Sequence, residues 1–134
     1  MPTATRVSVV DASALAAILF GEPEGEAVAQ FLAGSRLVAP ALLAFELANV
    51  CLSKMRRQPQ LREALFEAFQ LRERMALEEA MVDAAGVVRL AAETGLTAYD
   101  ASYLWLAREL GADLITLDRQ LAKAGSTSLA NRPR

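Results

Sequence analysis

Short apolar runs alternate with longer segments of helical periodicity along the chain, and this alternation constrains the fold more than any other feature. Residues 7–10, 36–39 and 113–117 are short and rich in Val, Leu and Ile, which is typical of buried strands. The longer segments between them carry apolar residues at helical spacing. Because strands that alternate with helices form parallel sheets covered on both faces, we expect a three-layer α/β/α domain of the α/β class with a mostly parallel central sheet.

Most of the expected helices end close to a glycine or proline, residues that stop a helix. Pro40 is expected at the first position of the long helix that runs to about residue 57, where its missing N–H is not needed, and Pro59 ends that helix. Residues 77–81 fit either a strand or more helix, and residues 126–129 are a candidate for a last edge strand. The expected helices cover residues 12–20, 23–33, 40–57, 61–75, 83–93, 97–110 and 119–124.

A chain of 134 residues with 54% apolar side chains has the length of one domain and enough apolar material for a buried core. We therefore expect a single domain over residues 1–134, with only residues 131–134 as a loose tail. Asp11 interrupts the apolar run of residues 7–20, which argues against a signal peptide, and no segment is suited to span a membrane. Cys51 is the only cysteine, so no disulfide forms within the chain, and we expect a cytoplasmic protein.

Histidine is absent from the sequence, and this absence excludes several kinds of active site. A Ser-His-Asp triad, a histidine acid–base pair and a histidine-ligated zinc ion all require it. Hydrolytic chemistry must therefore use carboxylates, hydroxyls, lysine, arginine or a metal ion. The net charge of −2 gives no bulk indication of nucleic-acid binding, although metal ions bound to carboxylates invert a negative charge locally.

Three aspartates are expected at one edge of the sheet. Asp11 and Asp118 each come directly after a predicted strand, so parallel pairing of the two strands would place both carboxylates at the same edge. Asp100 lies in the first turn of the helix that begins near Thr97, and this turn can face that edge. Ligands of such sheets bind at the carboxyl ends of the strands, close to the point where the strand order reverses.

Glu46 stands in a helix that is apolar nearly all round, and most of that helix is expected to be buried. A lone buried carboxylate is costly unless it is paired or bound to a metal ion. Asn49 and Ser53 lie three and seven residues further on, on the same face of the helix. We expect this narrow polar face to point into a wet cavity.

Four acidic side chains around one cavity would repel one another, and a cation relieves that repulsion. A site with only oxygen ligands suits Mg²⁺ or Mn²⁺, and Mg²⁺ keeps several waters and needs only one or two direct carboxylates. Such an ion activates water and stabilises the leaving oxygen of a phosphodiester. Ser13 and Thr116 each lie two residues from an aspartate of the set, Asp11 and Asp118, and are expected to orient water or the phosphate.

An alternative is that these aspartates only cap helices, because Asp is a preferred N-cap residue. Asp11 and Asp118 each precede an expected helix, and Asp100 stands three residues after Thr97, as in a capping box. Glu46 has no such capping role. The four acids together therefore favour a functional site over three unrelated caps.

Four segments of the sequence resemble the PIN-domain ribonucleases, and among these the VapC-type toxins of bacterial toxin–antitoxin pairs. They are VVDASA at residues 9–14, PALLAFELANV at 40–50, TAYDASY at 97–103, and LITLD at 114–118 followed by Leu121. The likeness covers almost the whole chain, with a core from about residue 7 to about residue 129. Its specificity comes from the order and spacing of the four segments together.

The resemblance implies a function and a set of site residues. It implies Mg²⁺ or Mn²⁺ as cofactor, RNA as substrate, a homodimer, and a small antitoxin protein that blocks the site. The hydroxyls of the family fall on Ser13 and Thr116. The acidic quartet, as catalytic residues and candidate metal ligands, falls on Asp11, Glu46, Asp100 and Asp118.

We therefore expect a metal-dependent endoribonuclease, the toxin of a toxin–antitoxin pair, that uses a metal-activated water and leaves a 5′-phosphate and a 3′-hydroxyl. One rival is a phosphohydrolase of another α/β class, such as a haloacid-dehalogenase-like enzyme with Asp11 as covalent nucleophile. That class has a second aspartate where this chain has Ser13. Another rival is a catalytically inactive PIN-like binding domain, and a third, a phosphoacceptor receiver domain, needs a suitably placed lysine after a late strand, which is lacking.

Several basic residues fit either contact with RNA or an ordinary structural role. Lys54, Arg56 and Arg57 close the long helix, where they face its dipole favourably, and this role is favoured over contact with an RNA backbone. Arg119 and Lys123 follow the last aspartate of the set and are better candidates for contact with a phosphate.

Two apolar surfaces fit either the core or an interface. Tyr99, Tyr103, Leu106 and Leu110 form a helical stripe that we expect in the core or in a dimer interface. Residues 61–75 carry more apolar surface than one helix face needs, and we expect part of it to meet a partner chain or an antitoxin.

Overall fold

Four parallel strands lie at the centre of the structure, a computed structural model that describes residues 5–125. Each pair of neighbouring strands is parallel, which confirms the expected α/β architecture with a parallel sheet. The edge strand expected at residues 126–129 and the tail expected at residues 131–134 lie outside the described residues. In sheet order, the strands are β3 (Leu77–Glu79), β2 (Arg36–Ala39), β1 (Val7–Val10) and β4 (Asp113–Ile115).

The helices form the connections between the strands. Within residues 5–125, no helix is long and apolar enough to cross a membrane. Between β1 and β2 lie α1 (Ala12–Leu19) and α2 (Gly25–Leu32). Between β2 and β3 lie α3 (Leu42–Arg57), η1 (Pro59–Leu61), α4 (Arg62–Gln70) and η2 (Leu71–Arg74). Between β3 and β4 lie α5 (Ala84–Thr94) and α6 (Ala98–Leu110), and β4 is followed by α7 (Arg119–Ala124).

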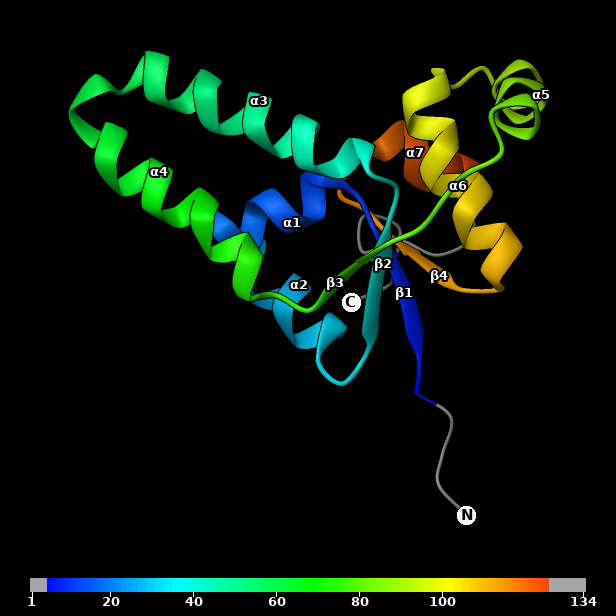
Figure 1. The fold of residues 1–134 in the computed structure, drawn as a ribbon, viewed down its shortest axis with the longest axis horizontal. Helices are drawn as coiled ribbons and strands as arrows, with labels where there is room; N and C mark the ends of the chain where they lie inside the picture. The colour runs from blue at the N-terminus through cyan, green and yellow to red at the C-terminus, as the bar shows by residue number, and fades with distance from the viewer. Residues whose placement is uncertain (1–4, 126–134) are drawn as a thin grey trace.

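Right-handed crossovers explain how these helices cover both faces of the sheet. The connections from β1 to β2 and from β2 to β3 step across the sheet in one direction, whereas the connection from β3 to β4 steps back past β1. Because parallel crossovers are right-handed, connections that step in opposite directions lie on opposite faces. Figure 1 shows α1 to α4 on one side of the sheet and α5 to α7 on the other, which gives the three expected layers.

β1 and the edge strand β4 are buried between the helical layers. Val9 and Val10 of β1, and Leu114 and Ile115 of β4, are buried together with side chains from both layers. Strands buried on both faces form continuous apolar runs, which is why these two could be predicted from the sequence. The largest of the helical side chains in this core are Leu15, Leu43, Leu47, Tyr103, Leu106 and Leu121.

The α3–α4 arm, residues 42–70, extends away from the sheet (Figure 1). Leu43, Leu47 and Cys51 are the buried residues of α3, and α4 contains none. Phe45 is 75% exposed. The expectation that most of α3 is buried is therefore wrong, because apolar residues surround this helix while only one of its sides packs against the body and α4.

Two further helix boundaries differ from the prediction. Pro40 lies two residues before α3, which begins at Leu42 with Ala41 as its N-cap, so the proline is not at the first helical position. Residues 61–75 do not form one helix, because α4 ends at Gln70 and the chain tightens into the 3₁₀ helix η2.

The ambiguous segment at residues 77–81 contains the edge strand β3. Its sequence, Leu-Glu-Glu, has no strand signature, and it is a strand because it pairs with β2. Arg36 of β2 and Glu78 of β3 also form an exposed ion pair at 2.8 Å. Tertiary pairing thus decides a segment whose local sequence is neutral.

Candidate active site

The carboxyl ends of β1 and β4 bring two of the predicted acids to one edge of the sheet. β1 and β4 are parallel neighbours, and the N–H of Asp11 donates to the carbonyl of Ile115 at 3.2 Å, just beyond the paired residues. Asp118 follows β4 by three residues at the same end. The chain leaves β1 toward β2 on one side and returns to β4 on the other, so this edge is a switch point where such sheets bind ligands.

Asp11 is a buried carboxylate, 5% exposed, that receives several hydrogen bonds. Its Oδ1 accepts from the hydroxyl of Ser13 at 2.7 Å and from the N–H of Ala14 at 3.0 Å, and its Oδ2 accepts from the hydroxyl of Thr116. Burial nevertheless raises the pKa of Asp11 to about 6, against the opposing effect of these hydrogen bonds, and the nearby charge of Asp118 adds to the rise.

Two hydroxyls that the sequence predicts for the site, those of Ser13 and Thr116, link the end of β4 to Asp11 by hydrogen bonds. The Oγ of Ser13 accepts from the N–H of Leu117 at 2.9 Å, and the Oγ1 of Thr116 accepts from the N–H of Asp118 at 3.0 Å. Each hydroxyl therefore donates to Asp11 while it accepts from the backbone of the segment that leads to Asp118. These bonds fix the spacing between the two aspartates.

The capping alternative holds for two aspartates and fails for the third. Asp11 and Asp118 are the N-caps of α1 and α7, so they cap helices and also lie at the shared edge. The N-cap of α6 is Thr97, whose Oγ1 accepts from the N–H of Asp100 at 3.1 Å. Burial and the charge of Asp118 both raise the pKa of Asp100, so these two carboxylates lie close enough to interact.

Glu46 reaches the same group of acids from α3. Burial raises the pKa of Glu46, the charge of Asp100 raises it further, and a hydrogen bond from the hydroxyl of Tyr103 opposes the rise. Asn49 is exposed and Ser53 is exposed, so the polar face of α3 continues from Glu46 to solvent.

Tyr103 is a site residue that the sequence analysis missed. It is 1% exposed, and its hydroxyl donates to Oε1 of Glu46. Burial, followed by Glu46, Asp11 and Asp100, raises the pKa of its phenol, so it lies among three of the four acids. The available signal was its position three residues after Asp100, which places both on one face of α6.

The four acids form a row of interacting carboxylates, and we call it the carboxylate row: Glu46, Asp100, Asp118 and Asp11. Within residues 5–125, no three acidic, histidine or cysteine side chains converge closely enough to enclose a metal ion. Hydrogen bonds hold Asp11 and Asp118 on helix N-termini and Glu46 on Tyr103. The candidate metal-ligand atoms are all carboxylate oxygens. Such a set fits a hydrated Mg²⁺ or Mn²⁺ bound directly by one or two carboxylates.

The basic candidates near Asp118 differ from each other. Arg119 is exposed at the first position of α7, next to the row. Lys123 lines a hollow with Gly111, the C-cap of α6, and Asp113, the first residue of β4, so it does not lie at the carboxyl end of that strand. The position of Lys123 therefore does not favour contact with a phosphate at the carboxylate row.

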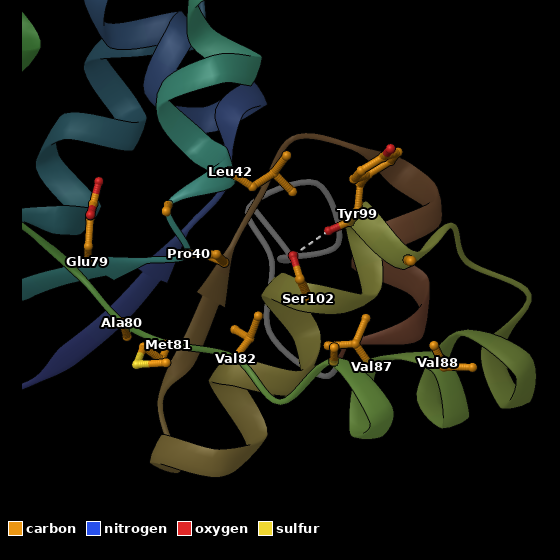
Figure 2. Close-up of a pocket in the computed structure, with 13 residues that line it drawn as sticks. Pro40, Leu42, Glu79, Ala80, Met81, Val82, Val87, Val88, Tyr99 and Ser102 are labelled. Carbon is orange, nitrogen blue, oxygen red and sulfur yellow. Dashed lines mark hydrogen bonds between the residues drawn. The ribbon is translucent and has the colours of Figure 1, made fainter.

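An apolar groove of about 630 Å³ lies beside Asp100, between the start of α3, the segment after β3, and α5 and α6. Figure 2 shows Met81, Val82, Val88 and Tyr99 around it, with the hydroxyl of Ser102 donating to the backbone carbonyl of Tyr99 at 2.6 Å. Met81 is 94% exposed. The predicted helical stripe on α6 is thus divided between the core and the surface. Tyr103 and Leu106 are core residues, whereas Tyr99 and Leu110 are exposed.

Comparison with known proteins gives a consistent group of relatives. The family described as PIN domain matches residues 8–126. Ribonuclease VapC3 of Pyrobaculum aerophilum is 36% identical over 123 residues, which cover 86% of this chain and 92% of that protein. The crystal structure of PAE2754 from Pyrobaculum aerophilum superposes with a TM-score of 0.75 at 27% identity, covering 92% of this chain and 88% of that one. VapC20 of Mycobacterium tuberculosis, described as a toxin that cleaves the sarcin-ricin loop, shares the fold with a TM-score of 0.63 at 17% identity, covering 88% and 95% of the two chains.

Proposed function

Because the chain belongs to the PIN-domain family, we propose that it is an endoribonuclease of the VapC type that acts as the toxin of a toxin–antitoxin pair. The observation that carries the proposal is the carboxylate row at the switch point of the sheet, with Asp11 buried against two hydroxyls. A protein that needed only helix caps would have no reason to bury Asp11 or to bring Glu46 to the same edge.

We propose Mg²⁺ or Mn²⁺ as the cofactor. Asp11 and Asp118 would hold the ion directly, and Asp100 and Glu46 would hold its waters. When bound, such an ion lowers the pKa of water and stabilises the leaving oxygen of a phosphodiester. Burial, together with the charge of a neighbouring acid, raises the pKa values of Asp11, Glu46 and Asp100, and a divalent cation would stabilise their charged forms.

The protein side chains have distinct tasks in this proposal. Ser13 and Thr116 hold both oxygens of Asp11 in one orientation, so the carboxylate needs no rearrangement when its ligand arrives. Glu46, whose pKa is raised by burial, would take a proton from the attacking water. Water as nucleophile needs no 2′-hydroxyl, so the products carry a 5′-phosphate and a 3′-hydroxyl.

The test is induction of the wild type and of Asp11→Asn in a host without the antitoxin, with growth and total RNA followed together. Asn keeps the cap and the shape of the side chain but loses the charge. The control is Asp83→Asn, because Asp83 caps α5 in the same way, accepting from the N–H of Gly86 at 2.9 Å, and lies outside the row.

We expect growth arrest and discrete RNA cuts with the wild type and the Asp83 variant, and neither with the Asp11 variant. If the folded Asp11 variant cuts RNA as the wild type does, Asp11 is only a cap; if neither protein cuts RNA, the inactive binding domain replaces the enzyme. Products with a cyclic 2′,3′-phosphate would instead rule out the metal-activated water.

We also propose a homodimer in which the apolar groove is covered by a second copy, and an antitoxin that contacts the exposed apolar residues of the α3–α4 arm. The groove exposes Met81 and Val88, and the arm exposes Phe45 and Phe66. Light scattering of Met81→Asp against the wild type tests the first contact. A wild type that is monomeric at all concentrations would contradict the dimer.

We further propose one domain over residues 1–134 that acts in the cytoplasm.

A further inference from the structure

On one side of α3, polar residues recur from the carboxylate row to the tip of the α3–α4 arm, with the partly buried Val50 beside them. Glu46, Ser53 and Arg57 are spaced by seven and four residues, so they lie within about 40° of one another around the helix. Arg56 is exposed on the neighbouring side of the helix, four residues after Leu52. At the rise of an α-helix, Arg57 lies about 16 Å from Glu46 along the axis. We call this face the α3 strip.

The tip of the arm is a concentration of positive charge in a chain whose net charge is −2. Residues 54–62 contain four cationic side chains and no acid. Arg56, Arg57 and Arg62 are exposed, and none of them forms an ion pair within the part of the chain that the structure describes. Their guanidinium groups are therefore available to an anionic partner.

The position of the tip relative to the carboxylate row is fixed by contacts along α3. Lys54 forms an ion pair with Glu22 at 3.1 Å and lies over the ring of Phe20, which ties the start of the arm tip to the α1–α2 connection. Cys51 is buried and donates from its Sγ to the carbonyl of Leu65 at 3.6 Å, which ties α3 to α4. The free arginines are thus held at a set distance from the acids.

We propose that the α3 strip binds the backbone of single-stranded RNA, with Arg56 and Arg57 on phosphates several nucleotides away from the bond that is cut. This inference rests on the proposed ribonuclease function and adds a determinant of substrate length. Arginine suits the role because its guanidinium contacts phosphate with two parallel hydrogen bonds.

The distribution of charge favours RNA over an acidic protein segment. A cation bound at the carboxylate row would attract RNA only locally, so attraction further along the strand must come from outside the row, and the arm tip supplies cations beyond Glu46 on α3. The exposed apolar residues Phe45 and Leu52, which suit a protein partner, lie on an adjacent side of α3. Ser53 is exposed between Glu46 and Arg57 on the strip, where it offers a polar contact to a solvated backbone.

The experiment compares Arg56→Gln/Arg57→Gln with Arg89→Gln/Arg108→Gln. Both pairs remove two exposed helical arginines, and Arg57 and Arg108 each lie in the last turn of their helix. The probes are fluorescent single-stranded RNAs of one composition, of about 20 and about four nucleotides. Binding is measured by anisotropy with Mg²⁺ in an Asp11→Asn background, which prevents cleavage, and cleavage is measured with Asp11 intact.

We expect the arm variant to bind the long RNA about tenfold more weakly, with the slope of log affinity against log salt reduced by about 1.4, as for two lost phosphate contacts. Cleavage of the short RNA should be unchanged, and the control pair should match the wild type in every measurement.

Three results would overturn the strip. The first is an equal loss of RNA affinity in the arm variant and the control variant. The second is an arm variant that loses as much activity on the short RNA as on the long one. The third is an arm variant that binds RNA fully but no longer binds a purified antitoxin. Binding is scored without cleavage, so a chain that binds through the arm but cuts no RNA contradicts the proposed function and leaves the strip standing.

Discussion

The carboxyl edge of β1 and β4 and the α3–α4 arm are built in opposite ways. At the edge, each buried polar group is held by neighbours from another element, as Asp11 is by Ser13 and Thr116. In the arm, α4 has no buried residue, and large apolar and cationic side chains face solvent. The edge has the fixed geometry that chemistry on a phosphodiester needs, and the arm has the free side chains that a partner needs.

The two regions also contribute differently to stability. The edge places an acid at a site where burial opposes its charge, so the same groups that suit the chemistry destabilise the metal-free fold at neutral pH. The arm keeps its few stabilising contacts on one side of α3, around Leu43, Leu47 and Cys51. Four predictions test this contrast, from the largest expected effect to the smallest.

The sharpest test within the arm replaces two leucines of the same helix. Leu47 is fully buried and Leu52 is 40% exposed. Leu47→Ala should lower the free energy of unfolding by about 3–4 kcal/mol, because it leaves a cavity, whereas Leu52→Ala should cost less than about 1 kcal/mol. Urea denaturation monitored by circular dichroism gives both values. Equal losses would mean that the outer side of α3 is also covered.

The stability of the metal-free protein should depend on pH through Asp11. Its pKa is raised from 3.8 to about 6 in the folded state, so the folded protein holds a proton that the unfolded chain has lost. The stabilisation is present below about pH 4 and disappears as the pH rises through about 6, and it amounts to at most about 3 kcal/mol. The shifts of Glu46 and Asp100 act in the same direction.

Thermal melts in EDTA across this pH range measure the effect. Asp11→Asn should flatten the dependence and raise the melting temperature near neutral pH. Addition of Mg²⁺ to the wild type should restore stability above pH 6, because ligands stabilise the state that binds them. A wild-type profile with no slope between about pH 4 and pH 6 would contradict the burial argument.

Thr116→Val removes the hydroxyl of Thr116 and nearly keeps the volume of the side chain, so it tests the role of the hydroxyl alone. The valine loses the hydrogen bond to Asp11 and the acceptor for the N–H of Asp118, and we expect ribonuclease activity to fall about 10–100-fold, as for other groups that orient metal ligands. Thr94→Val is the matched control, because Thr94 donates to the carbonyl of Leu90 and accepts from the N–H of Leu96, and neither bond involves an acid of the carboxylate row. Similar activity losses in both variants would indicate a general effect on folding.

The smallest expected effect is that of Tyr103→Phe, which removes only the hydroxyl that donates to Glu46. We expect about fivefold lower activity and a higher Mg²⁺ requirement, because the loss of one hydrogen bond is worth about 1 kcal/mol. Tyr99→Phe, at an exposed position on the same helix, should change neither. A loss of stability with an unchanged Mg²⁺ requirement would make Tyr103 a core residue only.

Much of the edge could be predicted from the sequence because its signals are local. A buried strand is a short apolar run, and an aspartate that ends such a run lies at the carboxyl end of the strand wherever the strand sits in the sheet. Asp11 and Asp118 are therefore placed by their own neighbours. The assignment of the row as metal ligands stays a prediction.

The remaining features depend on tertiary partners, which local sequence does not specify. Apolar residues on all sides of α3 predict that the helix is buried. The local sequence does not indicate that the body and α4 cover only one of its sides. β3 is a strand through its pairing with β2. Tyr103 looks like any core aromatic, because it is one, and its hydroxyl has a role only where Glu46 arrives from another element.

The pairing of β1 with β4 has a consequence for the timing of folding. These strands come from opposite ends of the described chain, so their contacts span more than a hundred residues and close late. During synthesis, residues 7–11 are ready long before residues 113–118 leave the ribosome, and Asp11 lacks Thr116 and Asp118 until then. A nascent chain of this design therefore has no assembled carboxylate row until residues 113–118 have been translated.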